Sequence, residues 1–184
     1  MRGVALFFAI LVFQNLFFYS QNCGVERWQV KTLSDVDTIK IDFKKIIPSS
    51  VHEQVLLARP EFKQERQNDE TSLYSISCYI IGYKKEKGDK DIHVIISDIK
   101  TGETMVAEIP NTECSELRGT SRYNSFVDLN LWFEKNIGHA SSRFHFPDKL
   151  IPVKLTGIGF WDFLHGQKGM AKNGREIHPV IGME

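Results

Sequence analysis

The residues with the clearest chemical potential lie near the C-terminus, in the segment GFWDFLHGQKGMAKNGREIHPV. Glu176 and His178 are two residues apart, so on a β-strand both side chains point to the same side of the sheet. Asp162 and His165 stand where the preceding apolar segment ends. If the residues between them fold as a hairpin loop, we expect all four side chains to converge. Carboxylates and imidazoles bind zinc or manganese and also act as general acids and bases.

This convergence supports one hypothesis, a metal-assisted hydrolase that would act, for example, on nucleic acid. A divalent metal is the cofactor under this hypothesis, with Asp162, His165, Glu176 and His178 as its ligands. The catalytic residues would be His93, on a neighbouring predicted strand, together with His165, Glu176 and His178. The spacing matches no specific metal motif, and the chain has no nucleophile elbow, phosphate loop, dinucleotide fingerprint or HExxH. No motif requires a cofactor.

The charge pattern favours a binding module without catalysis. The loop 165–176 holds three basic residues and no acidic one before its last position, and the loop 84–91 holds four lysines diluted by three acidic residues. Two basic loops that flank one groove can follow the phosphate backbone of an oligonucleotide or another polyanion. The residues expected to bind the ligand are Lys85, Lys87, His93, His165, Gln167, Lys168, Lys172, Asn173 and Arg175.

Two observations weaken the nucleic-acid interpretation. A surface for single strands needs several aromatic stacking platforms, but the expected groove offers only Tyr79 and His93, and Glu108 would repel phosphate. The C-terminal segment also has a structural explanation. Its glycines and the Asn173-Gly174 dipeptide suit a tight loop, and its histidines can bond backbone groups that such a loop leaves unpaired. The ligand therefore stays open among an oligonucleotide, an oligosaccharide and a partner in the cell envelope.

The elements that must position these residues are mainly strands. Strand patterns cover residues 72–86, 92–98, 104–110 and 150–163, and a short one surrounds 176–180. Residues 121–137 predict a helix between the third and fourth strands, because apolar side chains recur at helical spacing: Phe126, Leu129, Trp132 and Phe133.

Three strands, one helix and two strands is the order of the OB-fold, a five-stranded barrel in which the helix closes one end. Glycines interrupt both long strands, Gly82 among them, where a small barrel must bend. We therefore predict a mainly β protein, with an OB-fold-like barrel in residues 71–184. A plain α+β sandwich is the alternative. Residues 21–70 predict an extended N-terminal arm over this barrel, ending in the charged linker KQERQNDE.

The first residues, MRGVALFFAILVFQNLFFYS, are typical of a secretory signal peptide. One arginine precedes an apolar run and small Ser20 follows it, so we expect residues 1–20 to be cleaved near Ser20. The run is short for a membrane span and Gln14 and Asn15 interrupt it, which predicts no transmembrane segment after cleavage. A retained anchor is the alternative. The protein is thus expected to be secreted or periplasmic.

The three cysteines fit an exported protein. Cys78 lies within the alternating run LYSISCYII, which predicts a buried thiol. Cys23 and Cys114 have polar surroundings, and a disulfide between them would tie the arm to the barrel. Three free thiols are the alternative. No two cysteines are spaced for a zinc cluster.

The net charge gives no preferred partner. Lys and Arg together number 23, and so do Asp and Glu, so the formal net charge is zero. No global field attracts the chain to nucleic acid or anionic lipid, and such a preference must be local. We expect a single domain that is a monomer.

The stretches CGVERWQVKT, MVAEIP and above all TGIGFWDFLHGQKGMAKNGREIHPV resemble a family of secreted or envelope bacterial proteins of uncharacterised function. Members end in a similar GxGFxDFxHGQxGxAxNGxExHPV motif. The chain differs at Lys172, where proline is expected, and at Trp161, where phenylalanine is usual. The resemblance implies a secreted, OB-like domain and carries no established activity. Sequence alone thus predicts a secreted binding module whose groove lies between the loops 84–91 and 165–176.

Overall fold

The computed structural model describes residues 24, 26–61 and 63–184, and the expected signal peptide lies outside the described residues. No helix in this described part is long and apolar enough to cross a membrane. The strands are β1 (Ile46–Ser49), β2 (Leu73–Lys85), β3 (Ile92–Asp98), β4 (Thr104–Ile109), β5 (Ile151–Trp161) and β6 (Arg175–Met183). The α-helices are α1 (Trp28–Lys31), α2 (Val51–Val55) and α3 (Tyr123–Asn136). Short 3-10 helices cover η1 (Val36–Lys40), η2 (Asn68–Thr71) and η3 (Ser115–Gly119).

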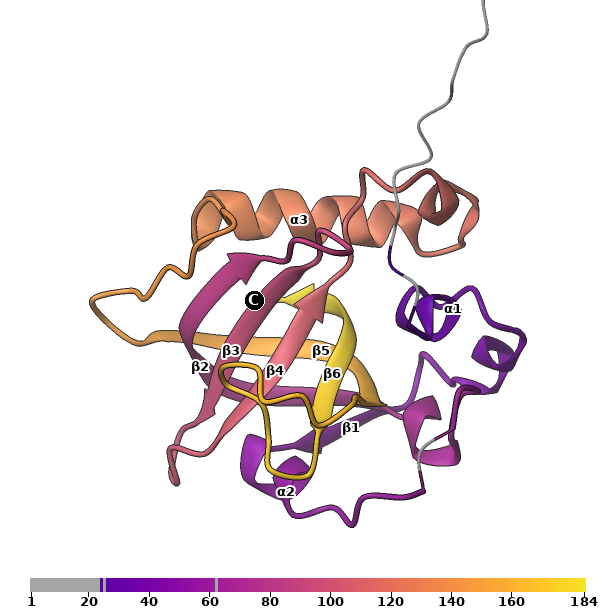
Figure 1. Ribbon diagram of the computed structural model, residues 1–184, viewed down its shortest axis with the longest axis horizontal. Coiled ribbons are helices and arrows are strands. Elements are labelled where there is room, and N and C mark those ends of the chain that lie inside the picture. Colours follow the sequence, from indigo (N-terminus) through magenta and orange to yellow (C-terminus); the bar gives the residue numbers. More distant parts are fainter. Residues whose placement is uncertain (1–23, 25, 62) are drawn as a thin grey trace, which may run out of the picture.

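Five strands form a closed mixed barrel, which confirms the predicted fold (Figure 1). The antiparallel strands β2, β3 and β4 follow one another, β4 pairs in parallel with β6, and β6 pairs antiparallel with β5. The antiparallel pairing of β5 with β2 closes the circle. β1 is an additional strand that runs parallel to β2. Its four residues are exposed or partly buried and include Pro48, so no clear alternation marked it in the sequence.

Glycines bend the two long strands, as the sequence predicted. The register between β2 and β3 shifts between Ile80 and Gly82, which is a β-bulge. The register between β5 and β6 shifts on either side of Gly157. A Cβ at Gly157 would lie 2.7 Å from the Pro179 carbonyl oxygen and 3.0 Å from the Val180 Cα. Only glycine lets the two backbones approach this closely.

The helix α3 lies across one end of the barrel, between β4 and β5 in chain order (Figure 1). Three of the apolar residues that predicted this helix, Phe126, Leu129 and Phe133, are buried. Leu129 and Phe133 pack on the barrel core, whose side chains come from alternate positions of the strands. Trp132 is partly buried against the same core.

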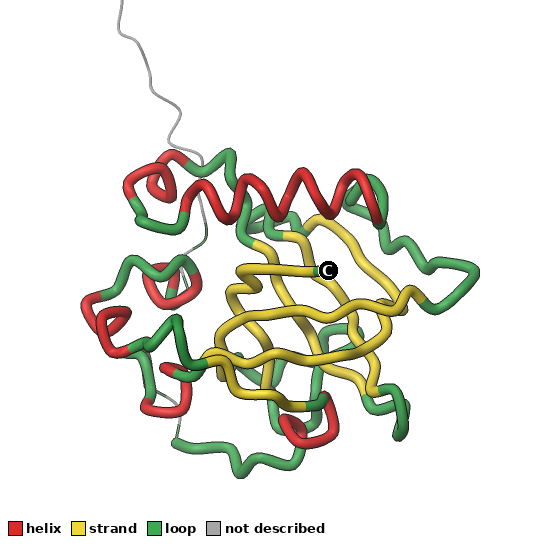
Figure 2. Tube along the Cα trace, turned by 180° about the vertical axis from the view of Figure 1, so that it is seen from behind, coloured by secondary structure: helices red, strands yellow, loops and turns green. Residues whose placement is uncertain are grey.

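The N-terminal arm is more structured than the predicted extended segment. It contains α1, η1, β1 and α2, and Figure 2 shows several of its short helices gathered on one side of the barrel. Leu33 and Ile41 pack with Leu73, Phe126 and Ile158 in a second small core. This local core gives the arm its turns, which the weak hydrophobic periodicity of the segment does not reveal.

The charged stretch 63–70 is also part of the folded structure. Arg66 and Glu70 are buried, at 7% and 0% exposure. Arg66 binds both carboxylate oxygens of Asp35, at 2.9 and 2.6 Å. Ion pairs thus fix the end of the arm, where charge composition suggested a solvated linker.

Of the cysteines, Cys78 is a free and buried thiol, as predicted. Burial raises its pKa to about 12. Cys114 is buried as well. Cys23 lies outside the described residues, so the bridge between Cys23 and Cys114 stays a prediction.

Candidate functional site

A cluster of ionisable side chains lies on the outer face of β3, β4 and β6. His93 of β3 is paired in register with Glu108 of β4, and Glu176 and His178 stand on β6. Alternation along each strand points these residues away from the barrel core. They are nevertheless enclosed: His93 and His178 are 0% exposed, Glu176 is 1% exposed and Glu108 is 5% exposed. The expected groove floor is therefore closed to solvent.

Segments of the same chain cover this face. The loop after β5 lies against β3, because a Cβ at Gly169 would stand 2.5 Å from a methyl group of Ile95. The same loop supplies the Lys168 carbonyl oxygen, which is 3.0 Å from His93 Nε2. Phe144 contacts the His93 ring edge-on, with 5.7 Å between the centroids. The protein's own loops thus occupy the place where the sequence analysis expected a ligand.

His178 lies between two carboxylates. Its Nε2 is 3.3 Å from Asp91 Oδ2, and its Nδ1 is 3.1 Å from Glu108 Oε2. Burial alone would lower the pKa of His178, but the two carboxylates outweigh it and raise the pKa to about 9. Because the partners face opposite ring nitrogens, the arrangement fits an imidazolium that is ion-paired on both sides, although neither nitrogen makes a hydrogen bond within the described residues.

The pKa values of the two glutamates in the cluster are shifted in opposite directions. Burial would raise the pKa of Glu108, but His178 and His93 hold it well below its ordinary value. The pKa of Glu176 is well above its ordinary value, because burial and then the charges of Glu108 and Asp162 oppose ionisation. Gln167 donates to Glu176 Oε1 at 2.7 Å. Sequence reasoning missed one further member, Lys31 of α1, whose pKa these carboxylates raise although burial opposes it.

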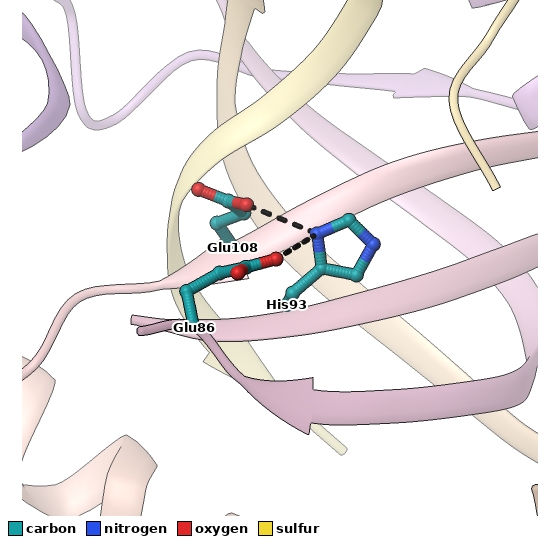
Figure 3. A group of neighbouring side chains, drawn as sticks. All are labelled: Glu86, His93 and Glu108. Carbon is teal, nitrogen blue, oxygen red and sulfur yellow. Dashed lines mark hydrogen bonds and ion pairs between the residues drawn. The ribbon is translucent and has the colours of Figure 1, made fainter. Parts of the chain in front are cut away.

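The four side chains expected to hold a metal do not form one ligand set. Half-exposed His165 places its Nε2 2.8 Å from Oδ2 of the buried Asp162. In the described part of the chain, neither of these residues belongs to a group of three or more candidate ligand atoms. Two such groups occur elsewhere in that part: Glu86, His93 and Glu108, and Asp91, Glu108 and His178. Figure 3 shows the first group, in which both carboxylates are directed at the same ring nitrogen of His93.

Some of the residues expected to bind a ligand are used in contacts within the protein, and others are exposed. Arg175 is fully buried, donates to Gln54 Oε1 at 3.0 Å and pairs with Asp69 at 3.2 Å. Asn173 donates to the carbonyl oxygens of Gln54 and Leu57, both at 3.0 Å. These two residues hold the loop onto α2, and Gln167 binds Glu176 as described above. Lys85 lies 3.8 Å from Glu113. Of the lysines expected to bind a ligand, Lys87, Lys168 and Lys172 are exposed.

An aromatic and basic surface, here called the rim, consists of Lys84, Phe144, Phe146 and Lys168. Backbone hydrogen bonds between Tyr83 and His145, at 2.9 and 2.8 Å, place Phe144 and Phe146 on one side of an extended segment. Their rings stack with 5.5 Å between centroids. The Lys84 ammonium lies 4.8 Å from the Phe144 centroid, and that of Lys168 lies 4.5 Å from the Phe146 centroid.

Sequence reasoning missed the two phenylalanines because they lie in a loop without a strand or helix pattern. The alternation Phe-His-Phe at 144–146 was the one available signal.

Comparison of the chain with protein-family models, with curated proteins and with solved structures finds no match in any of the three. The geometry of the chain's own side chains therefore carries the functional conclusion.

Proposed function

We propose that this protein is a non-catalytic OB-type binding module, and that the rim binds single-stranded nucleic acid. The observation that carries the proposal is the stacked pair Phe144 and Phe146 with a lysine ammonium beside each ring. Single strands are bound by aromatic rings that stack on bases and by nearby cations that neutralise phosphates. The expected signal peptide puts this binding outside the cytoplasm.

Exposure and charge support this choice of surface. Phe146 is 48% exposed, so a base has access to it. Lys168 is exposed and, among the described residues, has no acidic ion-pair partner. Arg143, also exposed, directly precedes Phe144. Glu86 pairs with Lys84 at 2.7 Å and reduces the local positive charge, so Lys168 contributes more to phosphate binding than Lys84 does.

Hydrolysis by the enclosed cluster has weaker support. A substrate would need access to His93, Glu176 and His178, which the arm and the loop after β5 enclose. The pair of half-exposed His165 and buried Asp162 belongs to no group of three candidate metal ligands in the described part of the chain. We therefore propose binding without turnover.

Fluorescence anisotropy of an end-labelled single-stranded oligonucleotide, at two salt concentrations and with chelator, tests the proposal. We expect a salt-sensitive rise, and we expect Phe146→Leu to weaken binding by about 1–3 kcal/mol per lost base stack, or roughly 5- to 150-fold. Lys168→Ala should weaken binding and reduce the salt slope by about one counterion.

Lys172→Ala is the matched control, because Lys172 is an exposed lysine of the same loop outside the rim. Equal losses for Lys168→Ala and Lys172→Ala would show diffuse attraction and overturn the rim as the site. A flat trace would exclude nucleic acid, and a metal-dependent fall below the starting anisotropy would show cleavage and exclude a purely binding function.

A further inference from the structure

Glu86, His93 and Glu108 bring three candidate metal ligands to adjacent strands. Glu86 directly follows β2, and His93 lies between Lys84 of β2 and Glu108 of β4 in the register of the sheet. His93 Nδ1 is 3.2 Å from Glu108 Oε1 and 3.5 Å from Glu86 Oε1 (Figure 3). The three side chains thus converge on one point without any rearrangement of the strands.

The hydrogen bond at the opposite side of the ring determines what His93 Nδ1 requires. A carbonyl oxygen only accepts, so the ring must donate from Nε2 to the Lys168 carbonyl, 3.0 Å away. In the neutral ring the lone pair is then on Nδ1, and it faces two carboxylate oxygens. Such an arrangement is unfavourable unless a cation stands between them. The Lys84 ammonium offsets the charge of Glu86 but not that of Glu108, so the cation beside Nδ1 is a proton or a metal ion.

The geometry suits a metal ion. Zinc binds nitrogen and carboxylate oxygen at about 2.0–2.2 Å, which separates neighbouring ligand atoms of a tetrahedron by roughly 3.3–3.6 Å. The two nitrogen–oxygen separations of the cluster, 3.2 and 3.5 Å, are close to this range. Metal-bound histidines commonly donate their second N–H to a backbone carbonyl, as His93 does to Lys168. The Glu86 side chain is 24% exposed and leaves a path from solvent.

We propose that Glu86, His93 and Glu108 bind a divalent transition-metal ion, with Zn²⁺ as the best fit and a fourth position open toward solvent at Glu86. One cation competes for this site. The Lys84 ammonium is 2.7 Å from Glu86 Oε1, the same oxygen that would bind the metal. Metal binding therefore requires Lys84 to move aside. The site does not depend on the proposed binding of nucleic acid.

Isothermal titration calorimetry of the chelator-treated protein with Zn²⁺ alone tests the site. We expect one site, and we expect Glu86→Gln to weaken it about tenfold or more, because a neutral amide is a poor zinc ligand. Glu86 is partly exposed, so this variant should fold, and circular dichroism checks that it does.

Glu103→Gln is the matched control, because Glu103 pairs with His52 at the surface and offers an adventitious histidine–carboxylate site. It should leave the affinity unchanged. Absence of binding by the wild-type protein would overturn the proposal, and so would an affinity that Glu86→Gln leaves unchanged. Loss of binding in Glu103→Gln alone would assign the zinc to the surface pair. None of these results depends on whether the rim binds nucleic acid.

Discussion

Arg27 and Glu70 form a bidentate ion pair that is closed to solvent. The two nitrogen–oxygen distances are 2.8 and 2.6 Å, and the side chains are 1% and 0% exposed. Glu70 also accepts from the backbone N–H of Trp161 at 2.8 Å, and Arg27 donates to the Trp161 carbonyl at 3.0 Å. The pair therefore fastens the arm to the end of β5, next to the loop that covers the ionisable cluster.

Removing one partner of this pair should destabilise the fold. Glu70→Ala leaves the Arg27 guanidinium without its buried carboxylate, and we expect the free energy of unfolding to fall by about 3–5 kcal/mol. Urea denaturation followed by tryptophan fluorescence measures this change. Glu113→Ala, which removes an exposed carboxylate 3.8 Å from Lys85, should change stability by no more than about 0.5 kcal/mol. Similar small effects of both variants would refute the anchoring role of Glu70.

The close approach at Gly157 allows a second prediction. A Cβ there would meet the Ile177 side chain, the Pro179 carbonyl and the Val180 Cα, and backbone atoms cannot move aside cheaply. We expect Gly157→Ala to lower the thermal midpoint and the free energy of unfolding, the latter by about 3 kcal/mol. Gly88→Ala is the control, because nothing lies within 4 Å of its Cβ position. If the two variants have the same thermal midpoint, the strands at Gly157 tolerate more separation than this geometry implies.

Asp35 gives a pH dependence. Burial would raise its pKa, but hydrogen bonds from Arg66 and Thr38 outweigh it, so the folded-state pKa lies below the ordinary aspartate value of 3.8. A lowered carboxyl pKa stabilises the fold above the unfolded-state pKa, and this contribution disappears as pH falls through the folded-state pKa. Asp35→Asn should therefore cost about 1 kcal/mol at pH 7 and much less near pH 3.

Denaturant unfolding of wild type and Asp35→Asn across this pH range measures the difference. For Asp128→Asn, on the surface of α3, the difference in unfolding free energy from wild type should not become smaller at low pH. A stability difference that stays constant from pH 7 to pH 3 would mean that the Asp35 charge is not what holds Arg66.

The barrel could be predicted because its signals are local. Alternation in residues 92–98 and the helical spacing of Phe126, Leu129 and Phe133 each depend on one element. The glycine at 82 indicated a bend for the same reason. The burial of His93, Glu108 and His178 could not be predicted in this way, because their strand positions are outward and only distant segments of the chain enclose them.

The candidate site could not be predicted for the same reason, because contacts between distant segments form it. Arg175 lies in a basic loop, and only its contacts with Gln54 and Asp69 show that it is structural. The convergence of Glu86 with His93 depends on the β2–β3 register, which the bulge at Gly82 shifts by one residue. Phe144 and Phe146 reach the rim because backbone bonds to β2 position their loop. None of these relationships produces a periodic pattern in the sequence.

Lys84 separates the two proposals, because it belongs to the rim and also competes for the metal site. Its ammonium lies beside the Phe144 ring and pairs with Glu86 at 2.7 Å. Lys84→Met keeps most of the side-chain volume and removes the charge. We expect it to weaken oligonucleotide binding, because a cation leaves the rim, and to strengthen Zn²⁺ binding, because Glu86 loses its competitor. Anisotropy and calorimetry on the same preparation measure both effects.

Lys172→Met is the control for Lys84→Met, since it removes an equal charge from outside both sites, and it should leave both affinities nearly unchanged. Weaker oligonucleotide binding with unchanged zinc affinity would retain the rim and remove Glu86 from the metal site. Tighter zinc binding with unchanged oligonucleotide binding would do the reverse. If both affinities fall together, the Lys84 ammonium acts mainly by holding the end of β2 in place, and neither assigned role of its charge survives.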